Sequence, residues 1–158
     1  MSESSSLYVF SLLIGIVAGL RAMTAPAAVS IGAYLGRLNL AGTSLAFLSS
    51  IYAACILGVL ALVELVTDQL PSTPSRKVPM QFGARLLTGG LSGAAIGASG
   101  GGLIAGLVAG VIGAVIGTLG GAAFRTKLAA TFGSDPPAAF TEDAVAIGLA
   151  ILIIVSQP

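Results

Sequence analysis

The sequence predicts an all-α protein, a polytopic transmembrane bundle of about five membrane helices, and three observations support that prediction. Hydrophobic residues make up 56% of the 158 residues, charged residues only 8%, and the mean hydropathy is +1.03. Long apolar stretches alternate with short turn sequences, and 22 glycines are spread through the chain. Because soluble globular domains average about 25% charged residues, this chain has too little polar surface for water and is expected to fold in lipid.

Five apolar stretches approach the roughly 20 residues that a spanning helix needs. Within a single domain over 1–158, they lie at about 7–35, 45–68, 80–98, 103–124 and 141–155. The first is longer than a straight span and contains Arg21 and Pro26, so it must tilt strongly or break around Gly19–Pro26. The proline-rich segment Pro71–Pro79 and the segment 133–137 are expected to form loops.

Glycines in the fourth stretch recur every three or four residues, which puts them on one helix face. They are Gly106, Gly110, Gly113, Gly117 and Gly121, and a similar stripe on the third stretch holds Gly93, Gly97 and Gly101. Small residues let helix backbones approach closely in lipid. The spacing leaves open whether these faces meet their own chain or a second copy. A homo-oligomer would then form through Gly93, Gly97, Gly106, Gly110, Gly113 and Gly117.

Basic residues outside the apolar stretches predict the orientation, because Lys and Arg accumulate on the cytoplasmic side. With five spans, the N-terminus shares one side with two loops that hold Arg76 with Lys77 and Arg125 with Lys127. The other side holds Arg37 alone. We therefore expect a multi-pass protein of the cytoplasmic (inner) membrane with a cytoplasmic N-terminus. The same four basic side chains are expected to face anionic headgroups, which makes membrane lipids the expected partners.

Charged side chains inside apolar stretches cost about 2.5–3.5 kcal/mol each on insertion scales, so their presence needs a reason. The predicted topology gathers them near the cytoplasmic side as an ion-paired polar centre. A short internal match of Gly19-x-Arg21-x-x-Thr24 with Gly83-x-Arg85-x-x-Thr88 adds two threonines. The candidate residues for binding a substrate or ion are Arg21, Thr24, Glu64, Asp68, Arg85, Thr88, Glu142 and Asp143.

The same charges also have structural interpretations. Glu142 and Asp143 would complement the dipole in the first turn of the last helix, with Thr141 as its N-cap. Arg125 would extend its long side chain to the headgroups. The charges that lie deeper within the stretches need a partner or a water-filled cavity.

Several functional classes are disfavoured by what the sequence lacks. Histidine is absent, and Cys55 is the single cysteine, within an apolar stretch. This excludes metal frameworks built from His and Cys and leaves a cysteine nucleophile without a histidine base. No basic run with interleaved aromatic residues points to nucleic acid. We expect no catalytic residues, no metal, no cofactor and no nucleic-acid partner.

Three short motifs carry a family resemblance. They are Gly19-Leu20-Arg21-Ala22, the segment from Glu64 to Pro71, and the pair Glu142-Asp143. Together they resemble the DUF4126 family of small bacterial membrane proteins, over most of the chain. The resemblance implies a multi-span membrane protein with a set of polar positions, and it names no activity. Gln69 departs from the lysine that the family is expected to have there.

Three functions compete on these observations. The first is a small transporter or channel for a charged solute that passes through the polar centre. The alternative is a membrane module that binds anionic lipid or a partner protein without transport. An intramembrane enzyme ranks last, because paired carboxylates alone lack a nucleophile and a histidine base.

Overall fold

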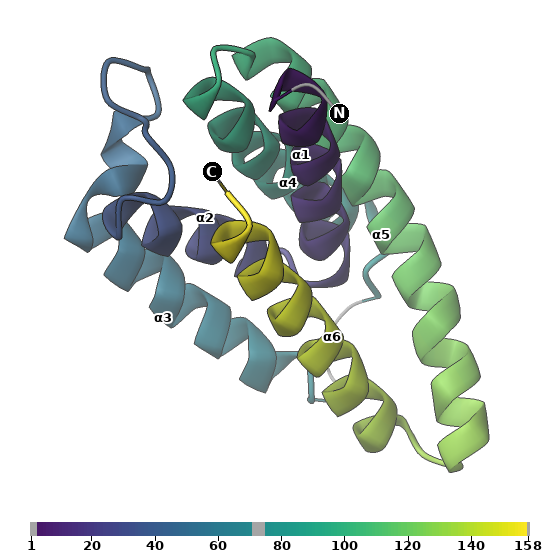
Figure 1. The fold of residues 1–158 in the computed structure, drawn as a ribbon. Helices are drawn as coiled ribbons and strands as arrows, with labels where there is room; N and C mark the ends of the chain where they lie inside the picture. The colour runs from purple at the N-terminus through teal and green to yellow at the C-terminus, as the bar shows by residue number, and fades with distance from the viewer. Residues whose placement is uncertain (1–2, 71–74, 158) are drawn as a thin grey trace.

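The computed structural model describes residues 3–70 and 75–157, and within these its regular elements are all helices, which confirms the all-α part of the predicted class. Its elements are α1 (Glu3–Leu20), α2 (Thr24–Tyr34), the 3₁₀ turn η1 (Ala46–Ser49), α3 (Ile51–Thr67), α4 (Pro79–Ser99), α5 (Leu103–Phe132) and α6 (Asp135–Val155) (Figure 1). By length and composition α5 and α6 can cross a membrane, and two shorter apolar helices cover Ser5–Leu20 and Ile51–Thr67. Residues 71–74 of the predicted proline loop lie outside the described residues.

The first predicted helix is two helices, with the break inside the predicted segment Gly19–Pro26. α1 ends at Leu20 and α2 begins at Thr24. Pro26 lies in the first turn of α2, where the missing N–H of proline costs no helical hydrogen bond. α2 does not continue along α1, and Figure 1 shows the α2–α3 connection at the same end of the molecule as the N-terminus. A tilted but continuous helix over 7–35 is therefore wrong.

This bend overturns the predicted placement of the N-terminus. A side chain on Gly100, in the α4–α5 turn, would meet Leu7, and one on Gly102 would lie 3.0 Å from the Tyr8 hydroxyl. The start of α1 therefore lies beside the α4–α5 turn, whereas Gly133 lies at the far end of the 30-residue α5. The start of α1 and the loop that follows α5 therefore lie at opposite ends of the molecule. The prediction had placed them together because it counted α1 and α2 as one span.

The loop predicted over 133–137 shrinks to a short turn. α5 continues to Phe132, ends at Gly133 in the left-handed conformation (φ +72°), and α6 begins at Asp135. The prolines at 136 and 137 fit the first turn of α6, whose N–H groups have no helical partner. Glu142 and Asp143 therefore lie two turns inside α6, and not in its first turn. Thr141 is not an N-cap, since its hydroxyl donates to the Pro137 carbonyl at 2.8 Å.

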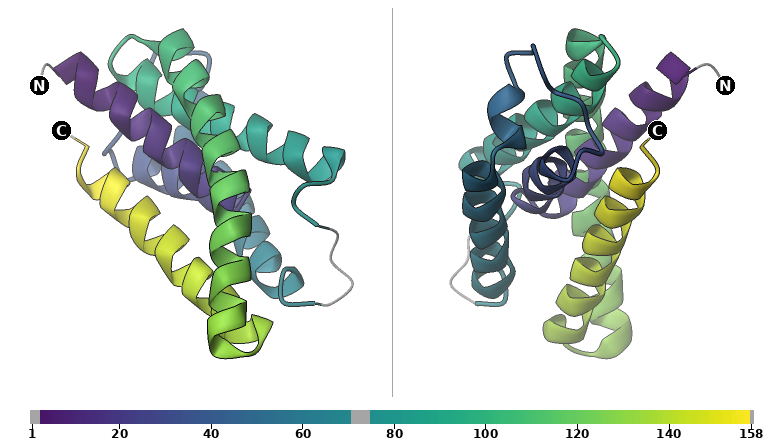
Figure 2. Two further views of the ribbon diagram at one scale, coloured as in Figure 1. Left: turned by 90° about the vertical axis from the view of Figure 1, so that its right-hand side faces the viewer. Right: turned by 60° about the vertical axis from the view of Figure 1, so that its left-hand side comes forward.

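Glycine faces pack α5 against α4 and α1 of the same chain, as the crossing ribbons in Figure 2 illustrate. A Cβ on Gly93 would stand 2.7 Å from the Gly110 Cα, and one on Gly97 would stand 2.8 Å from the Gly106 Cα. Farther along α5, a Cβ on Gly113 would stand 3.0 Å from the Gly15 Cα of α1. These backbones approach too closely for any side chain. The glycine faces, whose partner the sequence left undecided, are therefore covered by helices of the same chain.

Candidate functional site

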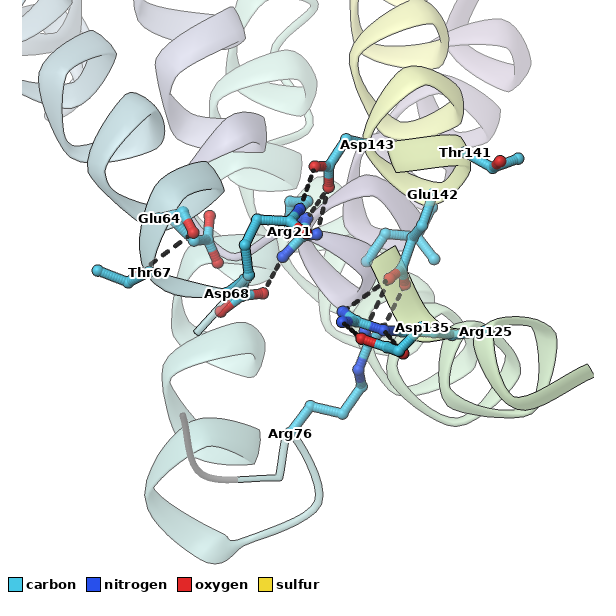
Figure 3. Close-up of polar contacts among 12 residues, drawn as sticks. Arg21, Glu64, Thr67, Asp68, Arg76, Arg125, Asp135, Thr141, Glu142 and Asp143 are labelled. Carbon is cyan, nitrogen blue, oxygen red and sulfur yellow. Dashed lines mark hydrogen bonds and ion pairs between the residues drawn. The ribbon is translucent and has the colours of Figure 1, made fainter. Parts of the chain in front are cut away.

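Arg21 lies at the α1–α2 break and is fully buried. Its Nε donates to Asp143 Oδ1 on α6 at 2.5 Å, and its Nη1 donates to Asp68 Oδ2 at the end of α3. The second oxygen of Asp143 accepts from Gln69 Nε2 at 3.2 Å. Figure 3 shows the guanidinium between the two aspartates. Arg21 therefore ties the break to α3 and α6, as expected for an ion-paired polar centre.

Glu64 binds backbone and not an arginine. Its two carboxylate oxygens accept from the N–H groups of Ala22 and Met23, both at 2.8 Å. These N–H groups immediately precede α2, where the helix dipole is positive, so a carboxylate is favoured there. Glu64 thus stabilises the beginning of α2. It was predicted to pair with a cation, and it binds backbone N–H groups at a helix terminus.

Arg85 binds the C-terminal end of α1, as Glu64 binds the start of α2. It is 2% exposed, and its Nη1 donates to the carbonyls of Gly19 and Leu20, both at 2.8 Å. A cation at the C-terminus of a helix is favoured by the dipole and satisfies carbonyls that have no helical partner. The break is possible in a buried place because Glu64 takes the free N–H groups and Arg85 takes the free carbonyls.

A second ionic cluster surrounds Glu142, which is fully buried on α6. Arg76 binds it with two hydrogen bonds of 2.5 and 2.8 Å, and Arg125 Nη1 lies 3.6 Å from its second oxygen. Arg125 also binds Asp135 at 2.9 and 2.5 Å (Figure 3). Gly121 makes room for this cluster, because a Cβ there would lie 3.0 Å from Arg76 Nη1 and 3.2 Å from Glu142 Oε1.

This cluster corrects the prediction that four basic side chains face lipid. Arg76 and Arg125 turn inward, with side chains only 10% and 17% exposed. The reason is the buried Glu142, which needs cationic partners that its own helix does not supply. Lys77 and Lys127 are exposed.

The two threonines of the internal match do not join the charged groups by hydrogen bonds. Thr88 donates to the carbonyl of Arg85 within its own helix at 3.3 Å. Thr24 is buried, and its hydroxyl has no hydrogen-bond partner among the described residues. The matched arginines also differ, since Arg21 binds carboxylates and Arg85 binds carbonyls.

A cavity of about 670 Å³ adjoins both clusters, among the end of α3, the start of α4, the end of α5 and the start of α6. Its polar lining consists of Arg76, Arg85, Arg125, Asp68, Asp135, Gln69, Gln81, Ser75 and Thr126. The side chain of Asp135 is 58% exposed and that of Arg85 is 3% exposed, so the cavity leads from an open rim to a buried end. Within the described parts of the chain, no group of three His, Cys, Asp or Glu residues is placed to hold a metal ion.

Sequence reasoning missed several members of the site. Gln81 and Asp135 lacked any sign of a role, because the first is an ordinary polar residue near a helix start and the second lies in an apparent loop. Arg76 was assigned to the lipid surface. Arg76 belongs to the site because it binds Glu142. The two residues are 66 positions apart in the chain, and no local sequence pattern predicts such a contact.

Fold and site together define a helical protein, rich in apolar helices, with buried ion pairs gathered around a helix break and beside a cavity. The model of the family described as "Domain of unknown function (DUF4126)" matches residues 9–156, and the chain belongs to this family. The resemblance seen in the sequence is thereby confirmed. Comparison with curated proteins gives no match, and comparison with solved structures gives none.

Proposed function

We propose that this chain is a multi-pass protein of the bacterial cytoplasmic membrane. The outer face of α3 supports this, since Tyr52, Ile56, Leu62 and Val66 are each more than 60% exposed. Monomeric soluble proteins rarely expose contiguous apolar patches larger than a few hundred Å², and lipid would cover this one. The apolar lengths of α5 and α6 agree with the same placement.

The orientation follows from the same basic residues with the corrected helix arrangement. Arg76, Lys77, Arg125 and Lys127 lie at the end of the molecule that carries the cavity, and this end faces the cytoplasm. The α2–α3 connection, which contains Arg37, and the start of α1 lie at the opposite end (Figure 1). The proposed orientation therefore has an outward N-terminus, and an engineered cysteine near Ser5 would react with an impermeant reagent added to whole cells.

We propose further that the protein is a transporter or channel for a small charged solute. The observation that supports this is the cavity, whose buried end reaches Asp68 and Arg85, both of which belong to the charged groups around the α1–α2 break. Membrane transporters place their binding sites at such discontinuous helices. Arg21 bridges Asp68 to Asp143, and exchanging these ion pairs for contacts with a solute would open the path.

The test is solute flux into liposomes that contain the purified protein, with a panel of small anions and cations. Ala129 lines the cavity, and its neighbour Ala130 is exposed and does not. Ala129→Trp should fill the cavity and reduce flux at least tenfold, whereas Ala130→Trp adds the same side chain one residue away and should leave flux unchanged. Absence of flux from the wild-type protein, or equal flux in both variants, would reject transport.

A module that binds anionic lipid is the second candidate, and the exposure of Lys77 and Lys127 favours it. Replacing both by Gln should then remove co-purifying anionic lipid without a change in melting temperature.

A homo-oligomer also remains a proposal. It would form through outer surfaces, because the glycine faces are covered within the chain.

A further inference from the structure

Arg85 lines the buried end of the cavity and has one buried donor to spare. Its Nε has no hydrogen-bond partner among the described residues, although the side chain is only 3% exposed. Its Nη2 lies 4.0 Å from Asp68 Oδ2, beyond hydrogen-bond distance. A buried donor without a partner is costly, by about 1–3 kcal/mol, and so needs an explanation.

The guanidinium edge that carries this Nε has a defined geometry. Nε and Nη2 lie along one edge of the guanidinium, and this edge binds two oxygens of a carboxylate or phosphate side by side. Nη1, which is bound to the carbonyls of Gly19 and Leu20 at 2.8 Å, fixes the orientation of the head group. The edge is therefore held in place before any ligand arrives, which lowers the entropy cost of binding.

The surrounding charges favour an acceptor at this position. Three arginines and two aspartates line the cavity. Both aspartates are engaged, Asp68 by Arg21 and Asp135 by Arg125, and Arg76 is engaged by Glu142, so Arg85 is the lining arginine with a donor to spare. Arg85 lines the cavity, and its buried, unpartnered Nε is a donor, so the group that is missing next to it is an acceptor and not a cation. Amide and hydroxyl groups of Gln81 and Thr126 line the same cavity.

We infer that the Nε–Nη2 edge of Arg85 is the binding edge for a tetrahedral oxyanion, a phosphate or the phosphate group of a larger molecule, that enters through this cavity. The volume of about 670 Å³ is ample for such a group. The inference names the solute class for the proposed transport function and rests on that function. Its chemistry is shared by free phosphate and by a phospholipid headgroup, and the experiment separates the two.

The experiment measures binding to the full chain in lipid-free detergent by calorimetry, with inorganic phosphate as one probe and a short-chain phosphatidic acid as the other. Binding of phosphate alone identifies a free anion, and binding of the lipid alone identifies a headgroup. Sodium chloride at equal ionic strength is the reference. Failure of both probes to bind above this reference overturns the inference.

Gln81→Glu is the decisive variant because it need not disturb the fold. Gln81 precedes Arg85 by four residues on α4, so a carboxylate there reaches the same guanidinium within the helix and competes with the oxyanion. We expect at least a tenfold loss of affinity. Arg37→Gln, which changes the net charge equally on an exposed residue outside the cavity lining, should bind as the wild type does. Equal affinity in Gln81→Glu and wild type would overturn the inference.

Arg85→Lys supplies a second variant that keeps the charge but removes the two-donor edge. Its affinity for phosphate should fall at least tenfold, and unchanged affinity would count against the assigned edge. The outcomes also separate this inference from the proposed function. Flux of cations without oxyanion binding would support transport and reject the oxyanion site on Arg85. Oxyanion binding without any flux would support the site and reject transport.

Discussion

Replacement of Arg21 by Met is the sharpest test of the ion-paired break. The substitution keeps an unbranched side chain but leaves Asp68 and Asp143, with side chains only 15% and 12% exposed, without their shared cation. Removing one partner of a buried ion pair costs about 3–5 kcal/mol, because the remaining charge stays buried. Gln69 keeps one hydrogen bond to Asp143, so the lower part of this range is expected.

The cost converts to a change in melting temperature. For a chain of this size, 1 kcal/mol shifts the melting temperature by about 2–4 °C, so a loss of about 3–4 kcal/mol should make Arg21→Met melt about 6–16 °C below the wild type. Thermal unfolding of the purified protein in a mild detergent, followed by circular dichroism, measures this. Arg37→Met, on an exposed residue, should change stability by less than about 0.5 kcal/mol.

A triple variant decides whether the loss comes from charge or from packing. Arg21→Met combined with Asp68→Asn and Asp143→Asn removes the stranded carboxylates, and it should recover most of the lost stability, because a neutral replacement of a buried ion network is often tolerated. If Arg21→Met alone melts within about 2 °C of the wild type, or if the triple variant is no more stable than the single one, the assignment of Arg21 to a charge network is refuted.

Two further predictions concern the elements around the break. Glu64→Gln should lower stability by about 1–3 kcal/mol in the same melting assay, because an amide presents one acceptor to the two N–H groups at the start of α2; an unchanged melt would dismiss this role. Gly110→Ala should prevent close packing, since the added Cβ would lie 3.0 Å from the Gly93 Cα and closer still to the Gly89 carbonyl. Gly58→Ala is the control, as nothing lies within 4 Å of its added Cβ, and equal melting temperatures for the two alanine variants would contradict the packing scheme.

The local features of this chain were predictable from its sequence. Composition set the helical, apolar character, and the spacing of Gly106, Gly110 and Gly113 showed that one face of α5 is made for close contact. The length of the first stretch and Pro26 predicted either a strong tilt or a break near Arg21, and the structure has the break. These properties depend on residues within a few helical turns of one another, so the spacing of residues and the presence of glycine and proline predict them.

The tertiary structure alone decided which charges meet and which way the chain turns. Arg21 reaches Asp143 across 122 positions, and Arg76 reaches Glu142 across 66. No periodicity encodes such pairings, because they depend on how separate helices pack. The direction of α2 after the break likewise depends on Glu64 and on helices that follow later in the chain, and an error there reversed the predicted side of the N-terminus. Local spacing therefore determined the helices, and long-range packing determined the site.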